Sequence, residues 1–409
     1  MASVSYVDDL LSLTRRWLNT SLNEVKKYLH SKGNPHEALR IFHVTGTNGK
    51  WSVCQMLSQL LHKQFGKRVG LFLSPHLVRV NERIQINSKP ITDTNFNKYV
   101  GKIYEETKDT YNFSFFVVIF LASIYYFLDK KVDYVVCEVG LWGTRDATNV
   151  WNHPLATFIT SVGYDHQRLL GKKLSQIQCN KMWIMKAGVP CYTPVHNDLM
   201  RRWATQKKAS LRIIADGKVE CWYKGVYKNT KKGLTNVPTN LPGSHQEQNA
   251  ALVYHCLREL GYKAEDIKQG LQRIVHMGRC QWLAKNILLD GAHNTSGIEV
   301  LSEYVDTVRH RYTKVITLFG SCKTSEEVGE FLSRCIKGNE NYLVQPSAHR
   351  WLAPAEYKEQ MPSPVKVIRK KPYQAYLFLK DKLSQDTLLV VYGSLYLAGE
   401  ILAEVGKKQ

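Results

Sequence analysis

A short glycine-bearing loop between a predicted strand and a predicted helix constrains this chain more than any other feature. Residues 39–44 form an apolar run of strand length, and residues 53–64 carry apolar side chains at helical spacing. Between them lies the hexapeptide 45–50, Thr-Gly-Thr-Asn-Gly-Lys. Small residues let backbone N–H groups point at phosphate oxygens, and a lysine supplies a cation. This order of strand, loop and helix therefore predicts a phosphate-binding loop.

Strand-like and helix-like segments alternate along most of the chain, which predicts an α/β fold with a mostly parallel sheet covered on both faces. Residues 200–240 are polar, and at most short antiparallel strands are expected there. The alternating pattern restarts after residue 278. Together with the length of 409 residues, the restart predicts two domains. Residues 1–275 would form the phosphate-loop domain, and residues 276–409 a smaller Rossmann-like domain. The expected strands are 69–73, 134–138, 156–162, 286–290, 314–319, 342–345 and 387–392, and the expected helices 115–128, 246–260, 264–274, 295–310, 325–336 and 395–405.

Composition limits the class of protein and its surroundings. Charged residues make up 22% of the chain, and no apolar run reaches the roughly 18 residues of a membrane span. The nine cysteines show no CxxC pairs, which favours reduced thiols in the cytoplasm and no zinc site. The net charge of +21 favours anionic partners, or else a basic solvated surface. The lysine pairs are dispersed along the sequence.

Further motifs follow the loop in a fixed order. They are HVTGTNGK at 43–50, LSPHL at 73–77, NERI at 81–84, EVGL at 138–141, DATNV at 146–150, DH at 165–166, KMWIMK at 181–186, HQ at 245–246 with Asn249, GR at 278–279, DGAHN at 290–294 and GSLY at 393–396. This series resembles the dihydrofolate synthase / folylpolyglutamate synthase family of Mur-type ligases. The match extends from about residue 33 to residue 402, and the ordered set is far more specific than any one motif.

The resemblance implies a role for each matching residue. The ATP-binding set would be Gly46, Thr47, Asn48, Gly49, Lys50, Ser52, Asn249, Arg279 and Asp290. Magnesium would be held by Ser74, Glu138 and His166, since Mg²⁺ prefers oxygen ligands. K⁺ is a second candidate cation, and Lys181 corresponds to a lysine that is often carbamylated in these ligases. The catalytic set would be Lys50, Lys181, Asp290 and His293.

The implied reaction is ATP-dependent amide formation. A carboxylate of dihydropteroate, or of a tetrahydrofolate (poly)glutamate, attacks the γ-phosphate to give an acyl phosphate, and the amine of L-glutamate displaces phosphate. Closure of the two domains would exclude water from the acyl phosphate. A pterin or folate and L-glutamate are thus the expected partners of a cytoplasmic monomer that contacts no membrane. A ligase with a different acceptor is a second enzyme hypothesis.

Three tryptophans depart from the family pattern. Trp51, Trp142 and Trp183 stand where the family has glycine, at positions expected to line or adjoin the phosphate and metal site. Overpacking costs about 1–3 kcal/mol per site, so three indoles there would disturb a close-packed region. One explanation is a catalytically impaired homologue that serves as a nucleotide- or RNA-binding scaffold. The other is that these three positions are encoded by UGA, which some bacteria read as glycine and which is written here as tryptophan.

Overall fold

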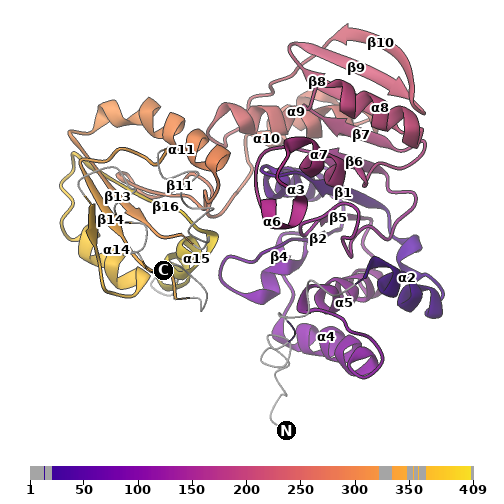
Figure 1. Cartoon of the computed structure of the whole chain (residues 1–409), viewed down its shortest axis with the longest axis horizontal. Helices are drawn as coiled ribbons and strands as arrows, with labels where there is room; N and C mark the ends of the chain where they lie inside the picture. Colours follow the sequence, from indigo (N-terminus) through magenta and orange to yellow (C-terminus); the bar gives the residue numbers. More distant parts are fainter. Residues whose placement is uncertain are drawn as a thin grey trace. The chain divides into compact units, whose positions relative to one another are not determined.

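The computed structural model describes residues 13, 21–321, 334–347, 353, 358 and 365–406, arranged as two compact units. The first unit comprises residues 1–76, 80–240 and 246–274, and the second comprises residues 77–79, 241–245 and 275–409. The main division therefore lies between Ile274 and Val275. Each unit contains its own sheet (Figure 1). The helix predicted at 325–336 falls mostly outside the described residues.

The sheet of the first unit has ten strands in the order β10-β9-β8-β7-β6-β1-β5-β2-β3-β4. The strands from β8 to β2 in this order run parallel, while β9 and β10 at one end and β3 and β4 at the other pair antiparallel. A parallel centre brings the carboxyl ends of its strands to one edge, where α/β proteins bind ligands. The strands are β1 Ile41–Thr45, β2 Val69–Phe72, β3 Ile84–Ile86, β4 Lys89–Pro90, β5 Tyr134–Glu138, β6 Ala156–Ile159, β7 Pro190–Thr193, β8 Ser210–Ala215, β9 Lys218–Tyr223 and β10 Val226–Lys232.

Helices connect and cover these strands, and several begin at side-chain caps. Ser21 and Glu24 form a capping box at the start of α2, and the Thr92 hydroxyl accepts a hydrogen bond from the Asn95 N–H at the start of α4. Helix α3 packs on β1, β2 and β5 and so fixes the phosphate loop to the middle of the sheet. The helices are α2 Leu22–Ser31, α3 Lys50–Gln59, α4 Asp93–Thr107, α5 Phe115–Asp129, α6 Gln167–Leu170, α7 Leu174–Met182, α8 Asp198–Lys207, α9 Ser244–Glu259 and α10 Ala264–Leu271.

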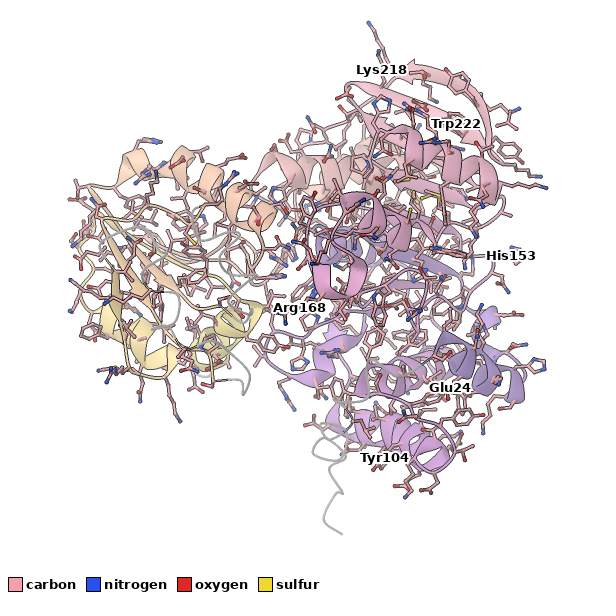
Figure 2. The ribbon with its side chains drawn as sticks, in the orientation of Figure 1. Glu24, Tyr104, His153, Arg168, Lys218 and Trp222 are labelled. Carbon is pink, nitrogen blue, oxygen red and sulfur yellow. The ribbon has the colours of Figure 1, made fainter. Side chains whose placement is uncertain are left out.

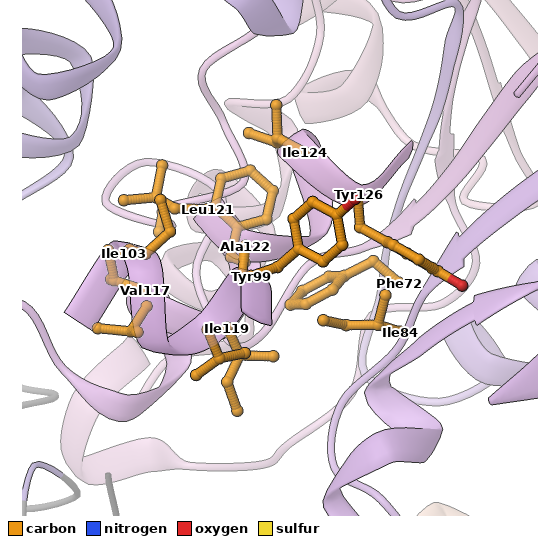
Figure 3. Packing of buried hydrophobic residues seen from close by; sticks show 14 of the residues in the cluster. Phe72, Ile84, Tyr99, Ile103, Val117, Ile119, Leu121, Ala122, Ile124 and Tyr126 are labelled. Carbon is orange, nitrogen blue, oxygen red and sulfur yellow. The ribbon is translucent and has the colours of Figure 1, made fainter. Parts of the chain in front are cut away.

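The main core of the first unit packs α5 against the sheet. All five residues of β1 and all five of β5 are buried, and α5 is apolar around most of its circumference. Figure 3 shows the resulting cluster, in which Phe72 of β2 and Ile84 of β3 pack with Ile119 and Tyr126 of α5. This core holds β1 and β5, the strands from which the phosphate loop and Glu138 extend.

The second unit has a six-stranded sheet in the order β11-β12-β16-β13-β14-β15. Among the described strands of this unit, only the β11–β12 pair is antiparallel. The α/β class with a large mostly parallel sheet and a smaller one is therefore confirmed. No helix in the described part of the chain combines the length and apolar composition needed to cross a bilayer. The elements are β11 Gln281–Ala284, β12 Ile287–Leu289, β13 Lys314–Phe319, β14 Glu340–Leu343, β15 Val365–Val367, β16 Thr387–Tyr392, α11 Thr295–Val308, α14 Pro372–Lys380 and α15 Leu395–Gly406.

Candidate active site

The loop between β1 and α3 has the conformation that a phosphate-binding loop needs. Gly49, with φ of +85°, is the N-cap of α3, and a Cβ on this residue would lie 2.7 Å from Asn249 Oδ1. A Cβ on Gly46 would lie 1.9 Å from the Thr160 hydroxyl oxygen. Both positions therefore require glycine. The loop leads into the N-terminus of α3, which is where phosphate loops bind their anion.

Hydrogen bonds to the strand-end segment 160–163 hold the loop in place. The Thr47 N–H donates to Ser161 O at 3.0 Å, and the Asn48 N–H donates to the Ser161 hydroxyl oxygen at 2.9 Å. The Thr47 hydroxyl donates to Gly163 O at 3.1 Å. Ser52 lies in the first turn of α3 and is buried. The predicted phosphate-binding residues thus form one ordered segment.

Two lysines converge on one carbonyl oxygen of this loop. Lys50 Nζ donates to Gly46 O at 3.0 Å and to Thr47 O at 3.1 Å, while Lys181 Nζ donates to Gly46 O at 2.9 Å. Lys181 comes from α7 and is 3% exposed. Two cations this close repel each other, so the arrangement favours an anion between them.

Burial gives the Lys181 amine unusual acid–base properties. Desolvation, and to a smaller degree the Lys50 charge, lower the pKa of Lys181 from 10.5 to about 7. Asp165 and Asp146 act in the opposite direction on the same pKa. A large part of the Lys181 side chains is therefore neutral near pH 7. A neutral amine is a nucleophile, whereas an ammonium is not.

Two of the three predicted magnesium ligands lie together. Glu138 ends β5 and is 3% exposed, and its carboxylate accepts a hydrogen bond from the Ser74 N–H at 3.0 Å. A buried carboxylate needs compensation by donors or by a cation. Carboxylate and hydroxyl oxygens suit a hard divalent ion, and the contact with the Ser74 N–H places these two residues next to each other.

The third predicted ligand, His166, sits on the loop after β6. It is the N-cap of α6, and its imidazole Nε2 is 3.8 Å from Asp165 Oδ1. Within the described ranges, no group of three or more His, Cys, Asp or Glu side chains has metal-site geometry. The predicted set contains only two such residues, because Ser74 is its third member. Its role as a metal site therefore stays a prediction.

In the second unit, Asp290 organises a compact polar group after β12. Its carboxylate accepts hydrogen bonds from the Ala292 N–H at 2.6 Å and the Cys280 N–H at 2.7 Å, and Arg279 Nη1 lies 3.9 Å away. His245 belongs to this neighbourhood, and burial lowers its pKa to about 4. His293 Nδ1 lies 2.9 Å from Gly291 O, just before α11. Asn249, by contrast, lies in the first unit against Gly49.

The three unexpected tryptophans occupy different surroundings. Trp51 is half-buried in the first turn of α3, directly after Lys50, and Trp142 is half-buried in the loop after β5. Trp183 is 39% exposed. Its ring packs edge-on against Trp203 at 5.3 Å, and Lys207 Nζ lies 3.8 Å from its centroid. The contacts of the Trp183 ring are thus with α8, where an indole is tolerated without filling the phosphate site.

Comparisons with known proteins agree with this geometry. Residues 44–257 match the model of the Mur ligase middle domain, and residues 275–347 match that of the dihydrofolate synthetase C-terminal domain. A dihydrofolate synthase/folylpolyglutamate synthase of Bacillus subtilis is 32% identical over 74% of this chain and 75% of its own length. The chain belongs to the dihydrofolate synthase/folylpolyglutamate synthase family. Members of this family are ATP-dependent glutamate ligases, and nothing in the comparisons supports a non-catalytic scaffold.

Other matches cover a larger share of the chain. The folylpolyglutamate synthase of Lacticaseibacillus casei is 29% identical, and the match covers 91% of both chains. The crystal structure of folylpolyglutamate synthase from Thermotoga maritima aligns with a TM-score of 0.75 at 26% identity, over 99% of this chain and 98% of that one. A bifunctional synthase from Yersinia pestis, complexed with AMPPNP and a Mn ion, has a TM-score of 0.84 over 99% of both chains. At 22% identity, this structural match shows that the two proteins share a fold.

Two aspartates that lie near Lys181 had no catalytic or binding role predicted from the sequence. Asp165 and Asp146 both act electrostatically on Lys181. Asp146 accepts hydrogen bonds from the N–H groups of Leu141 and Thr148 and from the Thr148 hydroxyl. Both aspartates stand inside motifs that were recognised. Their proximity to the lysine depends on how the loops after β5 and β6 fold, which the motif order does not specify.

Proposed function

We propose that this chain adds L-glutamate to dihydropteroate, to a tetrahydrofolate (poly)glutamate, or to both, with hydrolysis of ATP to ADP and phosphate. The convergence of Lys50 and Lys181 on the Gly46 carbonyl carries the proposal. The Lys50 ammonium at this phosphate loop fits the γ-phosphate and its developing charge, and Lys181 lies beside it. Family membership supplies the acceptor class and glutamate as the amine.

The loop would bind the ATP phosphates through its backbone N–H groups, with Lys50 as the counter-charge. Glu138, Ser74 and His166 would hold Mg²⁺, and the Yersinia pestis relative holds a Mn ion with its nucleotide analogue. A bound divalent ion would neutralise phosphate charge. An acceptor carboxylate oxygen then attacks the γ-phosphorus and ADP leaves. The glutamate nitrogen attacks the acyl carbon, loses a proton, and phosphate leaves.

Lys181 is proposed to react with CO₂ to form a carbamate. Its neutral amine attacks the carbon of CO₂ and releases a proton, which converts the neutral amine into an anion with two oxygens. The lowered pKa of about 7 supports this step, because only the neutral amine reacts. The carbamate would then face Lys50 as an opposite charge. It would also offer oxygen ligands to a second cation, Mg²⁺ or K⁺.

Residues of both units are proposed to serve the nucleotide and glutamate. Asn249, beside Gly49, would contact the nucleotide from the first unit. In the second unit, Arg279 and Asp290 would contact the nucleotide, and Asp290 with His293 would orient glutamate. We further propose that the enzyme acts as a cytoplasmic monomer. The domain limits 1–275 and 276–409 remain predictions for the independently folding parts.

Glutamate-dependent release of ADP tests this function. The protein is incubated with ATP, Mg²⁺ and either dihydropteroate or tetrahydrofolate, with and without L-glutamate. We expect turnover that requires glutamate, is abolished in Lys50→Ala and is retained in Lys63→Ala, an exposed lysine of the same helical segment. ADP release that ignores glutamate, or survives Lys50→Ala, would overturn the proposal.

A further inference from the structure

A buried glutamine lies about one helical turn before Lys181. Gln178 is 4% exposed, and glutamine is rarely buried to this extent unless its amide is hydrogen-bonded. Side chains three residues apart are neighbours on a helix, so Gln178 and Lys181 share a face of α7. A contact that fixes Gln178 therefore also limits how α7 can turn about its axis and where the Lys181 amine lies.

The Gln178 amide is joined to Asn197 by two reciprocal hydrogen bonds. Gln178 Nε2 donates to Asn197 Oδ1 at 2.9 Å, and Asn197 Nδ2 donates to Gln178 Oε1 at 3.0 Å. Gln178 Nε2 also contacts Met182 Sδ at 3.7 Å. Two parallel bonds between planar groups fix orientation as well as distance. The pair thus links α7 to the start of α8 with a defined geometry.

Capping of α8 explains only one side of this pair. Asn197 is the N-cap of α8, and its Oδ1 accepts a hydrogen bond from the Met200 N–H at 3.0 Å. Serine or aspartate would cap the helix about equally well. The cap also places no requirement on Gln178, since buried hydrogen-bonding partners can be replaced by apolar groups of the same shape at little cost. An amide at residue 178 therefore calls for another explanation.

The apolar contacts between α7 and α8 are less directional than this pair. The two helices lie side by side (Figure 1), and Met182 of α7 belongs to the same buried cluster as Met200 of α8. Trp222 of β9, labelled in Figure 2, packs against this cluster. Hydrophobic attraction is non-directional and methionine is flexible, so these contacts define the rotation of α7 less sharply than an amide pair does.

The consequence of a fixed rotation is largest at Lys181. Its Nζ donates to Gly46 O at 2.9 Å, although the two residues belong to different elements. A misplacement of about 1 Å at a reacting group can reduce the rate roughly 10²-fold. From these contacts we infer that Gln178 and Asn197 are positioning residues, which hold α7 in the rotation that places the Lys181 amine at the phosphate loop. The inference rests on the proposed function, which gives Lys181 its role in the reaction.

Substitutions at Asn197 test the pair without removing the cap of α8. Asn197→Ser keeps a capping hydroxyl but cannot form the two bonds to the Gln178 amide, whereas Asn197→Asp keeps the cap and still accepts from Gln178 Nε2. Each variant is made with lysine labelled by ¹³C at Cε, in buffer depleted of CO₂ so that the amine stays unmodified. The Lys181 resonance is identified by its absence from Lys181→Met. Its chemical shift reports the surroundings of the amine without requiring catalysis, and glutamate-dependent ADP release is measured in parallel.

Gln59→Met is the matched control for Gln178→Met. Gln59 is 3% exposed near the end of α3, and its amide is hydrogen-bonded to Gln55 at 3.1 Å and to Lys63 at 3.2 Å. Both substitutions remove a buried helical amide, so both should lower the midpoint of urea unfolding. Only Gln178→Met should displace the Lys181 resonance and reduce kcat.

In Asn197→Ser and Gln178→Met, we expect the Lys181 resonance to move toward the position of the exposed lysines. The kcat should fall at least about tenfold with the KM for ATP unchanged, and Asn197→Asp should recover part of this loss. An unmoved resonance in both variants, the same displacement in Gln59→Met, or a displaced resonance with full turnover would overturn the inference. Absence of glutamate-dependent turnover in the wild type would instead reject the proposed function, and the resonance would still show whether the pair places the Lys181 amine.

Discussion

At the residue scale, the protonation state of the Lys181 amine makes the stability of the protein depend on pH. It is buried beside Lys50 and hydrogen-bonded to Gly46 O, and its pKa is lowered to about 7. The unfolded chain holds this proton more tightly, so the contribution of Lys181 to the free energy of unfolding rises from about pH 7 to about pH 10.5. Below pH 7 the buried charge opposes folding fully.

Replacing Lys181 by methionine removes this dependence. Relative to the wild type, Lys181→Met should therefore gain stability at about pH 6 and lose that advantage progressively by about pH 9. Urea unfolding at both pH values measures the difference, in buffer depleted of CO₂ so that the amine stays unmodified. Lys186→Met is a useful comparison, since burial lowers the pKa of Lys186 only to about 8. A stability difference that does not change with pH would contradict the lowered pKa.

The proposed carbamate makes a separate prediction at the same residue. With ¹³C-labelled bicarbonate, the wild type should show a carbamate carbon signal by NMR that increases as pH rises through about 7, because the amine becomes neutral. The signal should be absent from Lys181→Ala and present in Lys186→Ala. Its persistence in Lys181→Ala would assign the carbamate to another lysine and leave Lys181 as an unmodified amine.

A buried hydrogen-bonded series joins β1 to the loop after β5. The Thr148 hydroxyl donates to Asp146 Oδ1 at 2.6 Å and lies 2.8 Å from His43 Nε2. Burial lowers the pKa of His43 to about 3, so its ring is neutral. Thr148→Val removes the hydroxyl that contacts both Asp146 and His43. It should reduce the free energy of unfolding, measured by urea titration, by about 1–3 kcal/mol. Thr205→Val, at an exposed helical hydroxyl, should have little effect; equal losses would refute the role of the buried series.

At the element scale, periodicity identified the regular strands and helices well. The predicted strand 387–392 coincides with β16, and the predicted helix 115–128 differs from α5 by one residue at its end. The segment 200–240 was the least informative, because β10 is exposed along its whole length and has no apolar pattern. Strand order also could not be predicted there, since antiparallel β9 and β10 extend a parallel sheet. Burial creates the periodic signal, and an exposed edge strand lacks it.

The loop after β5 connects two parts of the candidate site. A Cβ on Gly143 would lie 2.1 Å from Asn180 O and 3.0 Å from Lys181 O, so this loop packs directly on the end of α7. Gly143→Ala should push the Lys181 backbone away, reduce turnover and reduce stability by about 1–3 kcal/mol. Gly406→Ala is the control, because a Cβ there meets no atom within 4 Å. Unchanged turnover in Gly143→Ala would show that the loop does not position Lys181.

At the scale of the whole molecule, the motif order was enough to recognise the family and to expect two units. The nucleotide and metal residues were predicted from the motifs, in which the phosphate loop leads into α3 and Glu138 ends β5, and their roles stay predictions. Asp165 and Asp146 gained significance only from their proximity to Lys181, since motif order does not specify tertiary proximity.

The three tryptophans bear on whether the molecule as a whole is active. Simultaneous replacement of Trp51, Trp142 and Trp183 by glycine should raise turnover, because it removes indoles next to Lys50 and in the loop after β5. Trp151→Gly is the matched control. This indole is 4% exposed and donates to His36 O at 2.9 Å, so its loss should cost about 3–5 kcal/mol of stability. Lower turnover in the triple variant would show that the tryptophans belong to the site. UGG codons at all three positions would exclude glycine decoding.

The most direct test of the proposed chemistry follows the oxygen atoms of the acceptor carboxylate. Dihydropteroate or tetrahydrofolate labelled with ¹⁸O in that carboxylate is turned over with ATP and L-glutamate, and the released phosphate is analysed by mass spectrometry. If the carboxylate attacks the γ-phosphate at the Lys50 and Lys181 site, phosphate must carry an oxygen from the acceptor. Labelled phosphate that disappears in Lys50→Ala is the predicted result. Amide product accompanied by unlabelled phosphate would contradict an acyl phosphate.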